Sequence, residues 1–448
     1  MSYVLYVLGV LGIAVGVAAS IALHELGHLA PAKRFGIKCT QYMIGFGPTI
    51  WSRRIGETEY GLKAIPLGGY VRMLGMFPPK PGRAARADTT GRWGLMIEQA
   101  RDDAQRDISP QDGDRLFYQR SVPKRVVVML GGPLMNLLIA VVLLTMLVSV
   151  FGIKRESTLT LSQVNKCVIP ADAPPTRTCT PADKPAPGAA AGLRPGDTIV
   201  SVAGVAPTSW DDLRTAIRDN PGKPLPIVVQ RAGAPVPLTV TPVMDRREAL
   251  DDEGRPRLGP DGKAVLEEVG FLGLVPQSVR VTQPVSEVPA IIGTGLAKTA
   301  GVVLRIPEKM VGVAQAAFGA GERDPEGPVS VVGVARFGGQ IASLDGTVEQ
   351  PVSVGDKLVP LVALVASLNL ALFVFNMIPL LPLDGGHIAG ALWEGLRRRV
   401  AKLRDRPDPG PVDVARALPL AYAVASVLIV MSVLLIYADL VSPISLIG

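Results

Sequence analysis

The run YVLYVLGVLGIAVGVAASIALHELGH, residues 3–28, decides the fold and carries the first reactive side chains. From Tyr3 to Leu23 it contains no charged residue. About 20 apolar residues in a helix cross the roughly 30 Å of hydrocarbon in a bilayer, where a helix satisfies its own backbone groups. The run therefore predicts a transmembrane helix that ends in polar residues. A cleaved signal peptide is the alternative, but no positive charge precedes the apolar part.

Three further uncharged runs are long enough to span a bilayer, namely Val126 to Ile153, Leu358 to Leu383 and Ala417 to Ala438. Each meets the length that a helix needs to cross the hydrocarbon, and the surface of each would contact membrane lipid. We therefore predict a polytopic α-helical membrane protein with about four transmembrane helices.

Lysine and arginine residues gather in two segments between these runs, and the termini beyond the outer runs hold none. The first segment includes Lys33, Arg34, Lys38, Arg53, Arg54, Lys63, Arg72, Lys124 and Arg125, and the second includes Arg397, Arg398, Arg399, Lys402, Arg404 and Arg406. Because such residues favour the cytoplasmic side, both segments are expected in the cytoplasm. Both termini then lie outside a bacterial cytoplasmic (inner) membrane. No aromatic residues alternate with the charges, so nucleic-acid binding is not indicated.

The first basic segment also contains a predicted β element. Residues of about 40 to 75 predict short strands, broken by glycine and proline in Ile44–Pro48 and Pro66–Val71. Residues of about 76 to 125 are polar and charged. Much of this second part is expected to be a mobile cytoplasmic loop.

Residues of about 155 to 280 predict a soluble α+β domain outside the membrane. Val-rich strands at 198–202 and 225–229 flank a short helix that begins at a Ser209 cap. Asp251 to Lys263 is a charged insertion that we expect to form a hairpin tip.

Two of the three cysteines, Cys167 and Cys179, fall in this outside domain. An oxidising compartment favours a disulfide between them, and two unpaired thiols are the alternative. Cys39 falls on the inside, where a reduced thiol is expected.

Residues of about 285 to 320 are apolar but interrupted by Lys298, Arg305, Glu308 and Lys309. A fifth transmembrane helix here would conflict with the topology that the basic residues predict. An amphipathic helix at the outer membrane surface fits better.

Two of the three histidines stand in His24-Glu25-Leu26-Gly27-His28, at the end of the first apolar run. Positions i and i+4 share one face of a helix, so both imidazoles can bind one Zn²⁺. Glu25 beside them can take a proton from water and deliver it to a leaving amine. An interfacial polar cluster at the helix end is the bland alternative.

A tetrahedral catalytic zinc site needs a third protein ligand, and Asp384 follows the third apolar run. Pro379 and Pro382 interrupt the helix before it, and the predicted topology puts it at the depth of His24. His387 is a rival ligand three residues on, and a helix N-cap is the structural alternative for Asp384. In a different class of membrane metalloprotease the third ligand would be a later glutamate, for which Glu394 is the candidate.

With these motifs the chain resembles the site-2 protease family of intramembrane zinc metalloproteases, in the bacterial branch with an outside PDZ domain. That branch includes the regulator of sigma-E proteases. The resemblance covers nearly the whole chain, in the histidine motif, Gly68–Val71, Gly132–Asn136, Ala191–Ile199, Gly327–Ser330 and Asn376–Gly386. It implies that His24, His28 and Asp384 bind Zn²⁺, that Glu25 is catalytic and that His387 lies behind the ligands.

The resemblance also implies how a substrate is held and what the substrate is. Asn376, Asn369 and Gly68, Gly69 and Tyr70 would bind it, with a free strand edge in residues 41 to 72 pairing with the unwound segment. The substrates would be single-span membrane proteins, either anti-sigma factors or remnant signal peptides, cut in regulated intramembrane proteolysis. The PDZ-like domain would filter substrates by size, or bind an ectodomain or a chain end.

The expected organisation has eight parts. They are the first transmembrane helix (1–30), a cytoplasmic segment with the β element and loop (31–125), the second helix (126–153), the PDZ-like domain (154–280), an outer amphipathic segment (281–356), the third helix with the Asp384 motif (357–395), a basic connection (396–416) and the fourth helix (417–440). A non-enzymatic scaffold or transporter is the rival interpretation, and it predicts neither tightly bound zinc nor a role for Glu25.

Overall fold

The computed structural model describes residues 2–78, 92–106, 108–170, 179–250, 257, 265–319, 323–324, 327–344 and 353–444. These residues pack into two units, which are described separately. The helical unit contains Met1–Val148 and Pro284–Leu446, and the sheet unit is built from Ser149–Gln283. Apart from Arg257, the predicted hairpin tip at 251–263 lies outside the described residues.

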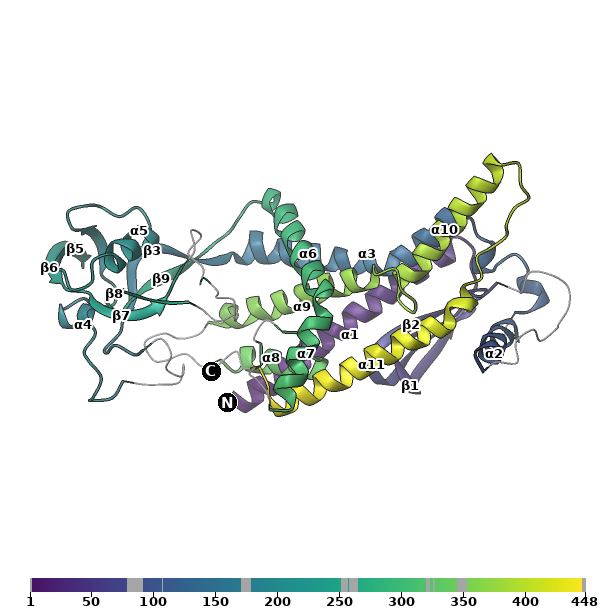
Figure 1. The fold of residues 1–448 in the computed structure, drawn as a ribbon, viewed down its shortest axis with the longest axis horizontal. Coiled ribbons are helices and arrows are strands. Elements are labelled where there is room, and N and C mark those ends of the chain that lie inside the picture. Colours follow the sequence, from purple (N-terminus) through teal and green to yellow (C-terminus); the bar gives the residue numbers. More distant parts are fainter. Residues whose placement is uncertain are drawn as a thin grey trace. The chain divides into compact units, whose positions relative to one another are not determined.

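The helical unit is built mainly from helices, several of which are long (Figure 1). They are α1 (Ser2–Arg34), α2 (Arg92–Arg106), η1 (Pro110–Asp112), η2 (Phe117–Gln119), α3 (Val122–Met146), η4 (Val285–Glu287), α6 (Val288–Leu304), α7 (Ile306–Ala317), α8 (Val331–Ala342), α9 (Val354–Asn376), α10 (Asp384–Leu403), η5 (Val414–Ala417) and α11 (Leu418–Val441). A π-helical turn, η3 (Leu147–Phe151), follows α3.

Five helices of the described part are long and apolar enough to cross a membrane, namely Tyr3–Arg34, Val122–Phe151, Val285–Leu304, Val354–Asn376 and Val414–Val441. Four of them overlap the predicted runs. The other one, Val285–Leu304, was expected at the membrane surface, and it is the least apolar of the five. Figure 1 shows its main helix, α6, crossing α9 instead of running alongside it. The helices are those of a polytopic membrane protein.

Side-chain contacts fix the directions of α1, α9 and α3. Ser20 of α1 accepts a hydrogen bond from Asn369 of α9, and a Cβ at Gly16 would lie against Val365. The two helices therefore run parallel. On α3 the order is reversed, because His24 contacts Asn136 whereas His28 contacts Val128. Helix α3 is therefore antiparallel to α1 and α9.

Helix α11 is antiparallel to α1 as well. Near its end, Asp439 accepts a hydrogen bond from the backbone of Ser330 at the start of α8. Gly338, further along α8, meets Gly9 near the start of α1. The end of α11 thus lies on the side of the bundle where α1 begins, as Figure 1 also shows.

The predicted β element is a hairpin of β1 (Cys39–Ile55) and β2 (Thr58–Met73). Both strands bend, so that residues 41–44 pair with 59–62 on one side and with 69–72 on the other. Residues 69–73 consequently form an edge that pairs with no further strand in the described chain. The hydroxyl of Tyr42 donates to the carbonyl of Ala22 at 2.7 Å and thereby ties the hairpin to α1.

The segment expected to be a mobile loop has more structure than predicted. Its described part forms α2, η1 and η2, and two ion pairs tie it to the hairpin. Lys38 contacts both carboxylate oxygens of buried Asp112 at 2.9 Å, and Arg115 binds Glu57 at 2.7 and 2.8 Å. The polar composition reflected these pairings as well as exposure to water.

The sheet unit holds a five-stranded sheet of order β6-β5-β4-β3-β9 and a separate β7–β8 pair. Its elements are β3 (Ile153–Val164), α4 (Pro187–Ala190), β4 (Thr198–Val202), α5 (Trp210–Arg218), β5 (Leu225–Arg231), β6 (Ala234–Val240), β7 (Val243–Glu248), β8 (Leu266–Phe271) and β9 (Leu274–Val281). Strands β4 and β5 cover the two predicted strands.

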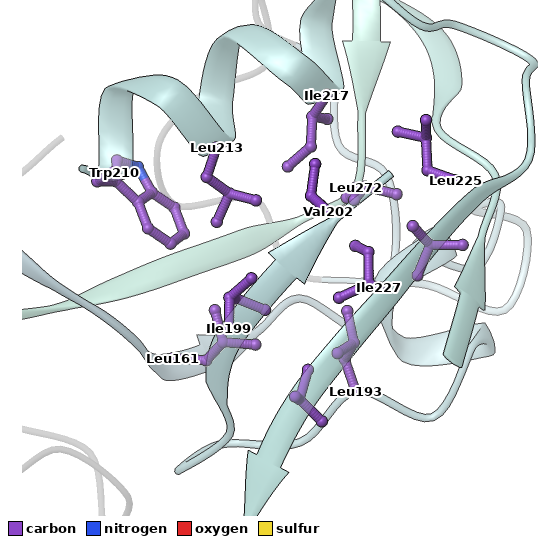
Figure 2. Packing of buried hydrophobic residues seen from close by; sticks show 12 residues of the cluster. Leu161, Leu193, Ile199, Val202, Trp210, Leu213, Ile217, Leu225, Ile227 and Leu272 are labelled. Carbon is purple, nitrogen blue, oxygen red and sulfur yellow. The ribbon is translucent and has the colours of Figure 1, made fainter. Parts of the chain in front are cut away.

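Helix α5 covers one face of this sheet. Ser209 caps it as predicted and forms a capping box with Asp212. Trp210, Leu213 and Ile217 point from the helix toward the core residues of the strands (Figure 2). Such an α+β unit with one contiguous core is stabilised mainly by apolar burial.

Cys167 and Cys179 of the sheet unit form a disulfide. The predicted pairing is therefore confirmed. Cys39, in the helical unit, is a buried free thiol, and burial raises its pKa to about 12. It is therefore an unreactive thiol at neutral pH.

Candidate metal centre

Three side chains from distant parts of the sequence converge in the helical unit. Nε2 of His24 and Nε2 of His28 lie 3.3 Å apart, and each lies 3.4 Å from Oδ2 of Asp384. The histidines share one face of α1, and Asp384 is the first residue of α10. Among the described residues they form the group of side chains that could hold a metal ion.

The spacing of the three atoms fits one zinc ion. In a tetrahedral site with bonds of about 2.0–2.2 Å, neighbouring ligand atoms lie roughly 3.3–3.5 Å apart. The three observed distances of 3.3, 3.4 and 3.4 Å match that triangle. Oδ2 of Asp384 is buried and accepts no hydrogen bond within the described chain, so its charge lacks a partner that a cation would supply.

Helix α3 orients both histidines without contributing a ligand. Nδ1 of His28 lies 2.8 Å from the carbonyl oxygen of Val128, and Nδ1 of His24 lies 3.2 Å from the amide of Asn136. Metal-binding histidines usually bond their second nitrogen to such a group, which fixes the ring. In the sequence, Asn136 stands out only as part of the Gly132–Asn136 motif that carries the family resemblance. No sequence pattern marks the Val128 carbonyl as a partner of His28.

Glycines let α1 and α3 approach closely at this point. A Cβ at Gly27 would lie 2.3 Å from the carbonyl oxygen of Gly131, and a Cβ at Gly132 would lie 2.1 Å from Nε2 of His28. A larger residue at either place requires the backbones to separate or the imidazole to move. These glycines therefore create the space that the ligands occupy.

Glu25 follows His24 on α1 and lies beside the hairpin. It is 8% exposed, and a Cβ on Gly69 would lie 2.8 Å from its Cγ. Gly69 belongs to the free edge of the hairpin sheet. A buried carboxylate thus lies next to the candidate metal ligands and beside an edge of the hairpin that pairs with no further strand in the described chain.

Comparison with known proteins agrees with this geometry. The sequence profile described as peptidase family M50 matches residues 12–406. The chain belongs to peptidase family M50. It is 34% identical to "Zinc metalloprotease Rip1" of Mycobacterium bovis (strain BCG / Pasteur 1173P2), over 99% of each chain.

Two more distant relatives extend the comparison. "Regulator of sigma-W protease RasP" of Bacillus subtilis (strain 168) is 27% identical, over 84% of this chain and 87% of its own. "Putative zinc metalloprotease all3971" of Nostoc sp. (strain PCC 7120 / SAG 25.82 / UTEX 2576) is 30% identical, over 85% of this chain and 84% of its own. The M50 protein is therefore a multi-pass zinc metalloendopeptidase of the site-2 protease type, with Zn²⁺ as its cofactor.

The two rival ligands of the M50 protease lie elsewhere. Glu394 is 1% exposed, and its oxygens bind Arg125 at 2.5 Å and the backbone of Val412 at 3.0 Å. His387 lines a small cavity with Arg125 and Glu394 and is absent from the three-residue group. Both side chains are on α10, and both follow Asp384 in the sequence.

The paired glycines after Asp384 have a steric role in the M50 protease. The turn from Ile378 to Leu383 folds back over the start of α10. A Cβ at Gly385 would lie 2.3 Å from the carbonyl oxygen of Ile378, and one at Gly386 would lie 2.6 Å from the backbone nitrogen of Leu381. The compact turn therefore requires glycine at both positions, and it leaves Asp384 at the helix start.

The predicted substrate-binding residues of the M50 protease fall into different surroundings. Asn369 is 0% exposed and donates to Ser20 and to the carbonyl of Val365, both at 2.9 Å. Asn376, in contrast, is half-buried at the last position of α9. The structure thus brings Gly69 to Glu25, whereas it encloses Asn369 between α1 and α9.

Gly68 and Tyr70 flank Gly69 on the hairpin edge. Gly68 has a φ of 95°, a left-handed conformation that glycine adopts without strain, and a Cβ there would lie 2.8 Å from the ring of Phe46. The ring of Tyr70 stacks on Phe46, with centroids 6.1 Å apart. Both residues thus shape the edge strand.

Proposed function

We propose that His24, His28 and Asp384 are the zinc ligands of this M50 protease and that Glu25 is its general base. The triangle of ligand atoms, with edges of 3.3–3.4 Å and a buried carboxylate beside it, is the observation that carries the proposal. When bound there, zinc supplies Lewis acidity at the scissile carbonyl and makes water nucleophilic near neutral pH. Glu25 accepts the proton of that water and passes it to the departing amine.

The substrate is held as an added strand. A transmembrane helix buries its amides in internal hydrogen bonds, so it must unwind before a peptide bond is exposed. The strand edge at 69–71 offers backbone groups to such a segment, and Gly69 brings this edge into contact with Glu25. In this proposal Tyr70 and half-buried Asn376 contact the extended chain, whereas the enclosed position of Asn369 favours a structural role.

The substrate class is single-span membrane proteins, in regulated intramembrane proteolysis. The name of the relative RasP, regulator of sigma-W protease, supports anti-sigma factors as substrates here. Remnant signal peptides are the second class. Both are single apolar helices that reach a site inside a helix bundle.

The test compares Glu25→Gln with Glu287→Gln, an exposed glutamate outside the site. Cleavage of a purified single-span reporter is measured in detergent or nanodiscs, together with bound zinc. Glu25→Gln should lower the cleavage rate by about 10²–10⁴-fold while zinc stays bound, because the lost group moves protons. Loss of zinc in this variant would place Glu25 among the ligands, and normal cleavage would refute the proposal.

The four helices α1, α3, α9 and α11 are the proposed transmembrane helices, with both termini outside and the zinc site toward the cytoplasm. Their alternating directions support this topology, since four crossings return the chain to the starting side. External labelling should modify Ser2→Cys and Ser442→Cys but not Arg404→Cys in the basic connection. If α6 also crossed the membrane, the two terminal positions would label from opposite sides.

We further propose that the sheet unit is a PDZ-like domain that binds a chain end. A cavity of about 430 Å³ lies between α5, which contributes Trp210, Arg214 and Ile217, and the loop Phe271–Leu274. The backbone amides of Leu272 and Gly273 donate to no group within the described residues. Free amides beside an apolar groove and a strand end suit a terminal carboxylate.

Peptide binding to the whole protein tests this domain assignment. Decapeptides ending in Val, Leu or Ala are compared as free acids and as terminal amides, by fluorescence anisotropy. The free acids should bind more tightly, because only they present a carboxylate. Equal binding of both forms would refute the chain-end proposal, and no binding of either would leave size filtering as the role of the domain.

A further inference from the structure

The imidazole of His24 has two nitrogens with different neighbours. Nε2 faces His28 and Asp384, whereas Nδ1 lies 3.2 Å from Nδ2 of Asn136. Asn136 is 1% exposed and comes from α3. Its other amide atom, Oδ1, is buried and accepts no hydrogen bond from the described chain.

The hydrogens on His24 decide what Asn136 must offer. A neutral imidazole carries one hydrogen, and a nitrogen that binds metal cannot carry it. If Nε2 of His24 binds zinc, Nδ1 therefore carries the hydrogen and needs an acceptor. The NH₂ group of an amide cannot accept, so the contact at 3.2 Å must be made by the amide oxygen.

The two ends of an asparagine amide have nearly the same shape, and exchanging them leaves the side chain in place. The exchanged orientation directs Oδ1 at Nδ1 of His24. In the present orientation Oδ1 has no donor among the residues described, so exchanging the two ends loses no hydrogen bond at that position. The hydrogen on His24 is therefore the deciding feature.

We propose that Asn136 is the positioning residue of His24: its side-chain oxygen accepts the Nδ1 hydrogen and fixes the tautomer and the plane of the ring. The inference rests on the proposed ligand role of His24. It gives both histidines one arrangement, since the Val128 carbonyl takes the Nδ1 hydrogen of His28 at 2.8 Å. Both acceptors belong to α3, which makes that helix the template for the site.

The experiment compares Asn136→Leu, Asn136→Asp and Asn369→Leu in the whole protein. Asn136→Leu keeps the approximate size without an acceptor, and Asn136→Asp restores an acceptor of the same shape. Asn369→Leu is the matched control, because Asn369 is also a fully buried amide on a neighbouring helix but bonds Ser20. Zinc release into excess chelator is timed, and the unfolding temperature of zinc-free protein is measured in parallel.

Asn136→Leu should weaken zinc binding by about 10–100-fold, as losing such an outer partner typically does, whereas Asn136→Asp should hold zinc nearly as well as the parent. Asn369→Leu should leave zinc release unchanged. A merely structural role would lower the zinc-free unfolding temperature in both Asn136 variants without this split. Zinc release at the parental rate from Asn136→Leu, or equally fast release from Asn136→Asp, would overturn the inference.

A His24→Ala variant separates this inference from the ligand assignment on which it rests. If His24→Ala retains zinc, the proposed ligand set itself is wrong. If His24→Ala loses zinc while Asn136→Leu keeps it, the ligand set stands and only the role of Asn136 is refuted.

Discussion

Two aspartates with little exposure to water, one in each unit, have opposite kinds of surroundings. Asp197 of the sheet unit is 1% exposed, and its oxygens accept hydrogen bonds from Arg231 at 2.7 and 2.8 Å and from the Arg194 amide at 2.8 Å. Asp384 of the helical unit is 18% exposed. Its Oδ2 lies 3.4 Å from a nitrogen of each histidine but accepts no hydrogen bond within the described chain.

The contrast separates stability from function. A buried carboxylate that is fully paired contributes to one folded arrangement, whereas an unpaired one costs free energy unless a ligand completes it. Around Asp197 every partner belongs to the chain. For Asp384 the proposed partner is a cation, so in this proposal the sheet unit folds by its own contacts and the helical unit leaves one place for zinc.

The largest effect is expected at Asp384 itself. Asp384→Asn removes the negative charge from the ligand triangle, and zinc affinity should fall by more than the about 10–100-fold that loss of an outer partner costs. Cleavage should be abolished with it. His387→Ala is the control, because His387 lies outside the triangle. Metal content and cleavage rate are the measurements, and an empty site in His387→Ala beside a full one in Asp384→Asn would reverse the assignment.

A steric change on α3 should have the next largest effect. Gly132→Ala places a methyl group 2.1 Å from Nε2 of His28, so the imidazole must leave the triangle. Zinc affinity should fall by about 10–100-fold, a loss comparable to that of an outer-shell partner. Gly12→Ala is the matched control, since a Cβ there meets nothing within 4 Å. Zinc titration checks this, and equal affinities would mean that α1 and α3 can separate without loss.

A smaller effect is expected where the hairpin edge meets the base. Gly69→Ala brings a methyl group 2.8 Å from Cγ of Glu25, which must shift, and small misplacements of catalytic groups cost up to about 10²-fold in rate. We expect roughly a 10-fold lower cleavage rate with zinc retained. Gly113→Ala, where the new Cβ would have an ordinary contact of 3.6 Å, serves as control. Unchanged cleavage by Gly69→Ala would separate the edge from the site.

The sequence predicted those features that local patterns encode. Uncharged length predicted four long apolar helices, the histidines at i and i+4 predicted the candidate metal site, and Ser209 predicted a helix start. The sequence could not reveal contacts made across the bundle, such as that of Asn136 with His24, because nothing in one helix records its neighbour. The loop after the hairpin was misjudged for the same reason, since Asp112 is recognisable as buried only with Lys38 beside it.

The rival ligands show a second limit of the sequence. Glu394 is a chemically suitable candidate, but its oxygens bind Arg125 at 2.5 Å and the backbone of Val412 at 3.0 Å. Glu394 and Arg125 are far apart in sequence, so their pairing follows from the packing of α3 against α10. Conversely, Asn369 carried an expected substrate role that its complete burial does not favour.

The paired aspartate should affect stability without affecting chemistry. Asp197→Asn removes the charge that binds Arg231. Because hydrogen bonds to charged groups contribute about 1.5–3 kcal/mol to stability, the variant should lose about 2 kcal/mol. Hydrogen exchange of β4 and β5 in the whole protein measures it. Asp211→Asn, at a side chain that is 70% exposed, should change exchange little. Zinc content should stay normal in both variants, and loss of zinc from Asp197→Asn would contradict the separation.

The smallest expected effect is a pH dependence confined to the sheet unit. The Arg231 guanidinium holds the pKa of Asp197 below its usual range, and the Arg194 amide lowers it further. Because the folded-state pKa is lower than the unfolded value of about 3.9, this stabilisation is fully present above that pH. It is lost as the pH falls through the lowered pKa, where the carboxylate takes up a proton. After correction for intrinsic exchange rates, protection of β4 and β5 should decline below about pH 4 in the parent, and this step should be absent in Asp197→Asn. The same decline in both proteins would assign the acid sensitivity to other carboxylates.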